Sequence, residues 1–328
     1  MTLLLARDDV ARVLTMPACI EAVEGAFAAL ARGEADMPQR AVIKVPPHHG
    51  LFLGMPAYLG GEAEALGLKL VTVYPDNPAQ HDLATTLGTL MLCDPRTGAV
   101  TAIMDAGYLT AVRTGAASGV ATRYLAREDA AVCVVFGAGV QARQQLVAVH
   151  EVRPLRQAYV LDVSAEAAAA FARDLAAQLG IAVEAVDDAE AAVRGADIVV
   201  TASSSPTPVL QGAWVQPGTH INNIGSHAPT TRELDTATVA RSYFVADLRE
   251  ANLAEAGDIL IPIAEGAVTA DHIAASLGEI VIGQKPGRTD AEQVTVFKSC
   301  GLAVQDVSTA VAVVQAARER GVGTEVSF

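Results

Sequence analysis

The stretch "VVFGAGVQARQQL", residues 134–146, decides the fold. Gly137, Gly139 and Ala142 stand in the spacing G-x-G-x-x-A, after an apolar run and at the start of an expected helix. In this context the first glycine makes a tight turn, the second lets the backbone approach a pyrophosphate, and the third small residue lets helix and strand pack closely. The N–H groups at the helix N-terminus then bind phosphate. The stretch therefore predicts a dinucleotide site.

The next apolar run, "AYVLD", ends in Asp162. A carboxylate at that strand end accepts hydrogen bonds from a ribose 2′-hydroxyl and repels a 2′-phosphate, so NAD is the predicted cofactor. Arg143 and Arg173 lie close enough in sequence to leave NADP open as an alternative. Val140 and Gln141, in the first turn of the helix, are expected to contact the cofactor.

Beyond this motif, strands and helices alternate, which predicts an α/β fold with a Rossmann-type, doubly wound parallel sheet. The expected strands are "AVCVVF", "AYVLD", "IAVEAV", "DIVVTAS", "THINNIG" and "YFVAD". In such sheets the ligand lies beyond the carboxyl ends of the strands, so residues there are candidates for the cofactor site. These candidates are Ser203, Ser204, Ile224, Lys298 and Ser299. His227 follows the strand "THINNIG" and is expected at the mouth of the same site.

The first third of the chain has a different pattern and predicts an α+β unit. Its first 30 residues are expected to be helical, with Pro17 opening an amphipathic helix. Short β-rich segments follow at 41–45, 51–59, 66–74, 86–93 and 99–105. A helix dense in small residues begins near 107, and a final amphipathic helix is expected to pack back on this unit. The predicted domains are 1–112 plus 305–328, for substrate binding and dimerisation, and 113–304, for NAD binding.

Composition excludes several classes of protein. Of 328 residues 51% are hydrophobic, and the formal net charge is -14 with a sequence pI of about 4.9. The acidic balance and the lack of basic runs argue against nucleic-acid or membrane partners and favour small molecules. The four cysteines are far apart in apolar surroundings, which favours reduced thiols and a cytoplasmic location. No signal or membrane-spanning pattern is expected, and no histidine pair has the spacing of a metal site.

Five motifs in order along the chain resemble the ornithine cyclodeaminase and mu-crystallin family. They are "GLKLVTVYPDN", "TAVRTGAAS", "VVFGAGVQAR", "THINNIGSHAPTTRELD" and "FKSCGLAVQDVSTA". The resemblance implies a Rossmann domain inserted into a dimerising α+β domain. It also implies NAD(P)-dependent chemistry at a carbon that bears both nitrogen and a carboxylate, and a threonine near nicotinamide that aligns with Thr85. The family includes cyclodeaminases, alanine dehydrogenases and imino acid reductases.

The resemblance further implies that Arg40, Lys69 and Arg113 hold the substrate carboxylate. The residues themselves agree, since Lys69 interrupts an apolar strand and Arg113 a helix of small residues, where an unpaired charge is costly. The alternatives are that Lys69 points to solvent and that Arg113 pairs with Asp105 or Asp94. Lys69, Arg113 and His227 are the predicted catalytic residues, with Lys69 assisting proton transfer at nitrogen.

Two departures from the family argue against cyclodeamination of ornithine. Leu53 and His227 stand where the resemblance implies a glutamate and an aspartate. The site then contains basic residues and no identified acid, so a buried distal ammonium would lack a partner. We therefore expect an NAD(H)-dependent reductase or dehydrogenase of a small α-imino or α-amino acid. Iminosuccinate, with His227 on its distal group, is the sharpest candidate and pyrroline-2-carboxylate the next.

The remaining alternatives are ornithine cyclodeaminase, alanine dehydrogenase and a non-catalytic nucleotide-dependent binding protein. The last would retain the glycine motif without needing all three basic residues. A serine hydrolase centred on Ser226 is disfavoured, because the strand–elbow–helix context of such a nucleophile is absent. The expected assembly is a homodimer.

Overall fold

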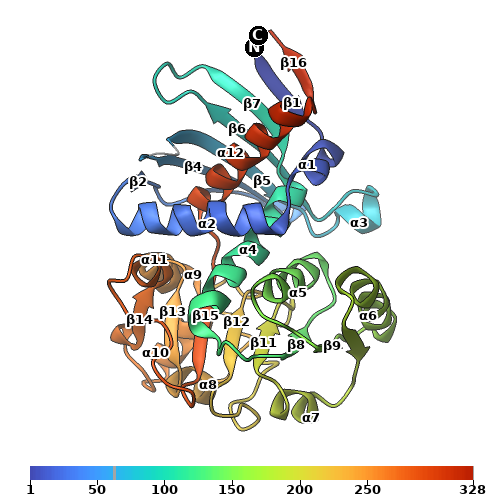
Figure 1. Ribbon diagram of the computed structural model, residues 1–328, viewed down its shortest axis with the longest axis vertical. Helices are drawn as coiled ribbons and strands as arrows, with labels where there is room; N and C mark the ends of the chain where they lie inside the picture. Colours follow the sequence, from blue (N-terminus) through green and yellow to red (C-terminus); the bar gives the residue numbers. More distant parts are fainter. Residues whose placement is uncertain (62–63, 328) are drawn as a thin grey trace. The chain divides into compact units, whose positions relative to one another are not determined.

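The computed structural model describes residues 1–61 and 64–327, which form two compact units (Figure 1). Unit 1 comprises Met1–Arg113 and Leu302–Phe328, and unit 2 comprises Thr114–Gly301. The predicted domain boundaries, after residues 112 and 304, lie inside helices α4 (Gly107–Leu125) and α12 (Ala303–Arg320).

Unit 1 is built on an eight-stranded sheet in the order β16-β1-β7-β6-β5-β4-β2, with β3 also paired to β4. Its strands are β1 (Thr2–Leu5), β2 (Ala35–Asp36), β3 (Ala41–Val45), β4 (Gly50–Leu59), β5 (Ala65–Val73), β6 (Thr86–Cys93), β7 (Val100–Asp105) and β16 (Thr324–Val326). All neighbours are antiparallel except β1 and β7. The five β-rich segments of the sequence thus form β3 to β7.

The expectation of a helical first 30 residues is wrong at Thr2–Leu5. This run pairs with β7 on one side and with β16, near the end of the chain, on the other. Four residues are too few to display a period, and the pairing that makes them a strand comes from distant segments. Helices follow at α1 (Arg7–Val13) and α2 (Met16–Ala31), where Thr15 caps the N-terminus and Ile20, Val23 and Phe27 are buried.

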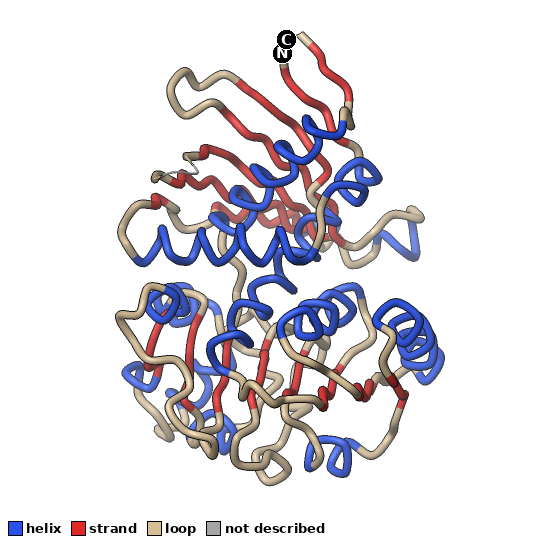
Figure 2. The backbone as a smooth tube through the Cα atoms, in the orientation of Figure 1, coloured by secondary structure: helices blue, strands red, loops and turns tan. Residues whose placement is uncertain are grey.

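The last helix, α12, packs against α2 and against β4, β5 and β6 (Figure 2). Its first residues follow directly on unit 2, so the chain returns to unit 1 through this helix. The close approach requires a glycine on β5, because a Cβ on Gly67 would meet Val307 Cγ2 at 3.0 Å and the carbonyl oxygen of Met91 at 2.9 Å. The first turn of α12 is therefore held against the sheet. A short helix, α3 (Asn77–Gln80), lies in the β5–β6 connection.

Unit 2 contains an all-parallel sheet in the order β10-β9-β8-β11-β12-β15-β13-β14. The strands are β8 (Val132–Phe136), β9 (Gln157–Leu161), β10 (Ala182–Ala185), β11 (Ile198–Thr201), β12 (His220–Asn223), β13 (Tyr243–Ala246), β14 (Ile273–Ser276) and β15 (Thr295–Lys298). Strand order runs one way from β8 to β10 and the other way from β8 to β12, which places a topological switch point between β8 and β11. This confirms the predicted doubly wound sheet.

Both faces of this sheet are buried, which explains the continuous apolar runs of its strands. Along β8, Cys133 and Val135 pack into one core, and Val134 and Phe136 into the other. The helices are α5 (Val140–Val152), α6 (Ala165–Leu179), α7 (Ala189–Arg194), α8 (Thr236–Ala240), α9 (Arg249–Glu255), α10 (Gly257–Ala264) and α11 (Leu277–Val281). The packed cores fix the strand ends on which the candidate site is built.

Candidate active site

The glycine-rich turn after β8 has the geometry of a phosphate site. Gly137 has a φ of +101°, and a Cβ there would meet the carbonyl oxygen of Ala202 at 2.6 Å, so only glycine fits. Gly139 is the N-cap of α5 and offers no side-chain cap, and beyond its two chain neighbours no atom lies within 4 Å of where its Cβ would be. Backbone N–H groups at the start of a helix attract anions, and the missing side chain leaves room for one. The turn therefore fits the pyrophosphate of a dinucleotide.

Asp162 follows β9 and braces this turn. Its Oδ2 accepts the Ala138 N–H at 2.8 Å, and its Oδ1 accepts the Ser164 N–H at 2.8 Å. Each carboxylate oxygen has a further lone pair for a ribose hydroxyl. The arginines that left NADP open contact Asp174 instead, Arg143 at 3.1 Å and Arg173 at 3.5 Å. Neither arginine therefore pairs with Asp162, and a carboxylate without such a partner favours a 2′-hydroxyl over a 2′-phosphate.

The other predicted cofactor residues occupy different surroundings. Val140 is 67% exposed at the start of α5, and Gln141 is half-buried with its Oε1 lacking a hydrogen-bond partner. Ile224 is buried and donates its N–H to the Thr201 carbonyl at 2.8 Å. Thr85 lies in unit 1, exposed directly before β6. The orphaned Gln141 oxygen is a polar group whose partner a bound nucleotide can supply.

A buried acid that the sequence reasoning missed connects the ends of β11 and β12. Glu233 Oε1 accepts from Ser203 N (2.7 Å) and Oγ (2.6 Å), and its Oε2 accepts from Gly225 N (2.7 Å) and Asn223 Nδ2 (3.2 Å). A Cβ on Gly225 would meet the Ser203 carbonyl oxygen at 2.2 Å. Burial raises the pKa of Glu233. The predicted cofactor residue Ser203 is thus held in place by Glu233.

The same network contains Lys298, at the end of β15. Its Nζ lies 3.0 Å from Asp258 Oδ2 and donates to the carbonyl oxygen of Ser226. Asp258 Oδ1 accepts the N–H groups of Glu233 (2.8 Å) and Leu234 (3.0 Å). Lys298 and Asp258 are fully buried. The Lys298 ammonium therefore binds Asp258 and the Ser226 carbonyl within the described residues. Its contact with the cofactor remains a prediction.

In unit 1, Lys69 and Arg113 meet at a buried carboxylate. Lys69 Nζ lies 2.7 Å from Asp306 Oδ2, and Arg113 Nε donates to Asp306 Oδ1 at 2.7 Å. Arg113 Nη1 also donates to Gln305 Oε1 at 2.8 Å. Asp306 is fully buried in the first turn of α12, and Lys69 is 2% exposed. Lys69 thus does not point to solvent, and Arg113 pairs with neither Asp105 nor Asp94.

Asp306 corrects the expectation that the basic residues have no acid beside them. Nothing in the local sequence distinguishes it, because it opens an amphipathic helix where an acidic residue is common for reasons of the helix dipole. Its partners lie on β5 and α4, where Lys69 is 237 residues and Arg113 193 residues away along the chain. Burial, opposed by Asp306 and reinforced by Arg113, lowers the pKa of Lys69 to about 8. Arg40, half-buried, contributes to the same lowering.

His227 is exposed in the loop after β12. Its neighbour Ser226 is buried, and its Oγ donates to the Thr231 carbonyl at 2.7 Å. That hydroxyl is used within its own loop, which leaves no support for a nucleophilic serine. The role of His227 on the substrate stays a prediction.

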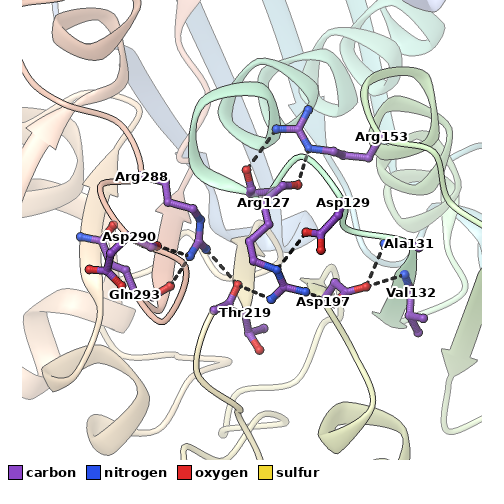
Figure 3. A network of polar contacts seen from close by, with 12 residues as sticks. Arg127, Asp129, Ala131, Val132, Arg153, Asp197, Thr219, Arg288, Asp290 and Gln293 are labelled. Carbon is purple, nitrogen blue, oxygen red and sulfur yellow. Dashed lines mark hydrogen bonds and ion pairs between the residues drawn. The ribbon is translucent and has the colours of Figure 1, made fainter.

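Three arginines lie at the N-terminal ends of the central unit 2 strands, away from the carboxyl ends that form the candidate site, and donate mainly to backbone carbonyls (Figure 3). Arg153 donates to Thr122, Arg123 and Ala126, at the C-terminal end of α4. Arg127 and Arg288 both donate to the Gly218 carbonyl, at 3.2 and 3.0 Å. Cations suit the carbonyl-bearing end of a helix, so this cluster stabilises the fold.

Within residues 1–61 and 64–327 no group of three or more His, Cys, Asp or Glu side chains could hold a metal ion. No single helix in that part of the chain is long and apolar enough to cross a membrane, and the bent pair Arg7–Val13 and Met16–Ala31 passes only by length and composition.

Comparison with known proteins agrees with this geometry. The chain matches the ornithine cyclodeaminase/mu-crystallin family over residues 1–321. The alanine dehydrogenase of Archaeoglobus fulgidus is 37% identical over 328 residues, which make up 100% of this chain and 98% of that protein. The topology places the chain among Rossmann-type α/β proteins. It belongs to the ornithine cyclodeaminase/mu-crystallin family, as its five motifs predicted.

Two solved structures are similar over almost their whole length. The Δ1-pyrroline-2-carboxylate reductase of Thermococcus litoralis, in complex with NADH and L-proline, is 45% identical with a TM-score of 0.95, and the match covers 99% of this chain and 100% of that one. The iminosuccinate reductase of Paracoccus denitrificans, in complex with NAD+, is 34% identical with a TM-score of 0.93, covering 100% and 99%.

Proposed function

We propose that this protein is an NAD(H)-dependent reductase of small α-imino acids, run in either direction. The observation that carries the proposal is the buried cluster of Lys69, Arg113 and Asp306, in which two cations share one carboxylate. One positive charge is left over in an apolar setting, and a buried charge of this kind calls for an anionic partner. The carboxylate of an amino or imino acid is such a partner.

The turn at Gly137 and Gly139 is proposed to hold the pyrophosphate, and Asp162 the adenosine ribose. The cofactor, when bound, supplies or accepts the hydride, and the protein supplies binding and electrostatics. The negative charge of Asp162 favours NADH over NADPH, because Arg143 and Arg173 are paired with Asp174. The NAD-containing structures of the relatives support the same choice.

Lys69, Arg113 and Arg40 are proposed to hold the substrate carboxylate. Arginine offers a planar fork to a carboxylate and lysine a point charge, so the pair fixes both position and orientation. Holding the imine carbon in a reactive position provides a large part of the rate. Lys69, with its pKa lowered to about 8, is protonated near neutrality and can hold or release a proton at the substrate nitrogen.

Pyrroline-2-carboxylate, which has a single carboxylate, is the substrate that this cluster fits best. Iminosuccinate is the second candidate, supported by the Paracoccus denitrificans relative and by an exposed His227 that could bind a second carboxylate. Asp306 supplies an acid beside the basic residues, so the expectation of an anionic distal group, which assumed a site without an acid, is weakened. Cyclodeamination of ornithine is disfavoured by Leu53, which offers no charge to a distal ammonium.

We also propose a cytoplasmic homodimer. The β3 strand has Val42 and Ile43 50% and 59% exposed, an apolar surface that a second copy could cover. An archaeal alanine dehydrogenase dimer with bound NAD is 36% identical with a TM-score of 0.93, which supports this assembly. The cysteines form no disulfide, which suits a reducing compartment.

The test is a panel of turnover assays that follow NADH and NADPH absorbance. Pyrroline-2-carboxylate, oxaloacetate plus ammonia and pyruvate plus ammonia are compared, and ornithine is assayed for proline release. We expect pyrroline-2-carboxylate to be reduced with oxidation of NADH, and kcat/KM for NADH to exceed that for NADPH at least tenfold. Asp162→Asn should narrow that preference. Proline release from ornithine, or NADH binding without turnover of any imine, would reject the proposal.

The place of His227 is tested separately with His227→Asp. If His227 binds a second carboxylate, the activity with oxaloacetate plus ammonia falls sharply and that with pyrroline-2-carboxylate changes little. Equal activities of wild type and variant on both substrates would leave His227 without a substrate role.

A further inference from the structure

Asp306 is an acid that the proposed chemistry does not itself require, yet it is the most confined group in the cluster. Both of its carboxylate oxygens are engaged, Oδ1 by Arg113 and Oδ2 by Lys69, each at 2.7 Å. Its neighbour Gln305 accepts a third bond, from Arg113 Nη1 at 2.8 Å. The first turn of α12 therefore fixes the direction of both cations.

The surroundings contain little else that could balance these charges. On the strands flanking β5, the residues opposite Lys69 are Met55 and Leu90, both buried and apolar. Cys19 on α2 is close enough for Arg113 and Asp306 to influence its pKa, but burial raises that pKa to about 12 and the thiol stays neutral. Arg40 adds a further cation. Within residues 1–61 and 64–327, Asp306 is the only acid among the charged groups that influence the pKa of Lys69.

We propose that Asp306 is a positioning and specificity-determining residue, which keeps Lys69 charged, orients Arg113, and sets the cluster to receive one carboxylate. The carboxylate-binding part of this inference rests on the proposed function. With Asp306 present, the two buried cations retain one net positive charge, and Arg40 adds a second at the half-buried side, so the cluster remains suited to an anionic substrate group. Without it, burial and the charge of Arg113 would act on Lys69 unopposed and favour the neutral amine.

The chain is well suited to a direct test, because it contains four lysines, Lys44, Lys69, Lys285 and Lys298. Protein grown with [6-13C]lysine gives four NMR signals, assigned by single Lys→Arg variants, with the exposed Lys44 and Lys285 as references. In the wild type the Lys69 signal should titrate near pH 8. In Asp306→Asn its midpoint should fall by about one pH unit or more, the usual effect of losing a close opposite charge. An unchanged midpoint would overturn the proposal.

Asp258→Asn is the matched control, since Asp258 pairs with the other buried lysine at 3.0 Å. It should lower the midpoint of Lys298 and leave that of Lys69 in place. If Asp306→Asn does not fold, Arg113→Gln gives an independent reading, because removing that cation should raise the Lys69 midpoint. A fall in that variant would contradict the account.

The specificity part is measured by titration calorimetry with L-proline and NAD+ at pH 7.5. Asp306→Asn should weaken L-proline binding at least fivefold, and Asp306→Glu, which keeps the charge, should restore part of it. Unaltered affinity in Asp306→Asn would refute the positioning role. If the wild type fails to bind L-proline, the proposed function is wrong, and the NMR titration still decides whether Asp306 holds Lys69 charged.

Discussion

Lys69 and Lys298 are both buried beside an aspartate, yet their pKa values shift in opposite directions. Each is buried, and each lies beside an aspartate, at 2.7 Å for Lys69 and 3.0 Å for Lys298. For Lys69, burial is the largest influence and Arg113 adds to it, so the pKa falls to about 8 despite Asp306. For Lys298 burial also acts to lower the pKa, but Asp258, Cys300 and Glu233 together outweigh it and the pKa rises.

The comparison shows that the charged groups beyond the paired aspartate decide what a buried lysine can do. Lys69 shares its acid with another cation and keeps a net positive charge available to a ligand. Lys298 has more negative charge around it than it can balance, and it also donates to the Ser226 carbonyl. Lys69 is therefore suited to binding and proton transfer, and Lys298 to holding the strand-end loops of unit 2 in place.

The largest expected effect is on stability, from Lys298→Met. This change leaves Asp258 buried without its cation, which typically costs about 3–5 kcal/mol. Lys69→Met should cost less, because Asp306 keeps Arg113 as a partner. Urea denaturation of both variants measures the free energies of unfolding. A larger loss in Lys69→Met than in Lys298→Met would reverse the assignment of roles.

Arg113→Ala should next lower kcat/KM for pyrroline-2-carboxylate at least tenfold, since a charge-assisted hydrogen bond contributes about 1.5–3 kcal/mol. The dissociation constant for NADH should change little, because Arg113 contacts residues of unit 1. Arg12→Ala, which removes a surface ion pair with Asp9, is the matched control and should leave both values near wild type. Unchanged kinetics in Arg113→Ala would make Arg113 structural.

The pH dependence of kcat/KM separates the two lysines again. Lys69 is charged below its lowered pKa of about 8 and neutral above it. The value of kcat/KM should therefore be at its maximum below about pH 8 and fall as the pH rises above it. The expected fall is about tenfold per pH unit for one essential proton. Lys69→Arg should move this limb to higher pH, because a guanidinium stays charged. A wild-type profile that is flat up to pH 10 would exclude Lys69 from the step.

His220 extends the comparison to a buried base whose charged neighbours are the cations Arg288 and Arg153. Burial, followed by Arg288, lowers its pKa to about 3. The pKa of a histidine in the unfolded chain is about 6.5. Above that pH the ring is neutral in both states, so it does not change the free energy of unfolding. Below that pH only the unfolded chain takes up the proton. Stability should therefore fall by up to about 1.4 kcal/mol per pH unit between pH 6 and 4. His220→Gln should reduce that slope, and equal slopes would contradict the assignment.

Much of the fold was predictable because it depends on local patterns. The glycine spacing at Gly137 and Gly139 and the apolar runs after it indicated the parallel sheet, and β3 to β7 followed from short β-rich segments. β1 and β16 could not be foreseen, since each is a short run that becomes a strand through a partner far away in sequence.

In the candidate site, too, the residues marked by the local sequence were predictable and those defined by distant partners were not. Lys69 and Arg113 were conspicuous as charges in apolar elements, so their burial was foreseeable. Asp306, Glu233 and Asp258 were not, because each is an ordinary acid in a helix or loop and acquires its role from side chains or N–H groups on other elements. Charge in an apolar run is a local signal, whereas the partner that balances it is a property of the fold.

The most direct test of the central claim measures, by calorimetry, the binding of L-proline to Lys69→Met and Lys298→Met with NAD+ present. The titrations are run at pH 7.5 and at a temperature where circular dichroism shows both variants to be folded. We predict that affinity falls at least tenfold in Lys69→Met and stays within about threefold of wild type in Lys298→Met, in line with the loss of one charge-assisted bond. Retained affinity in Lys69→Met, with loss in Lys298→Met, would contradict the account.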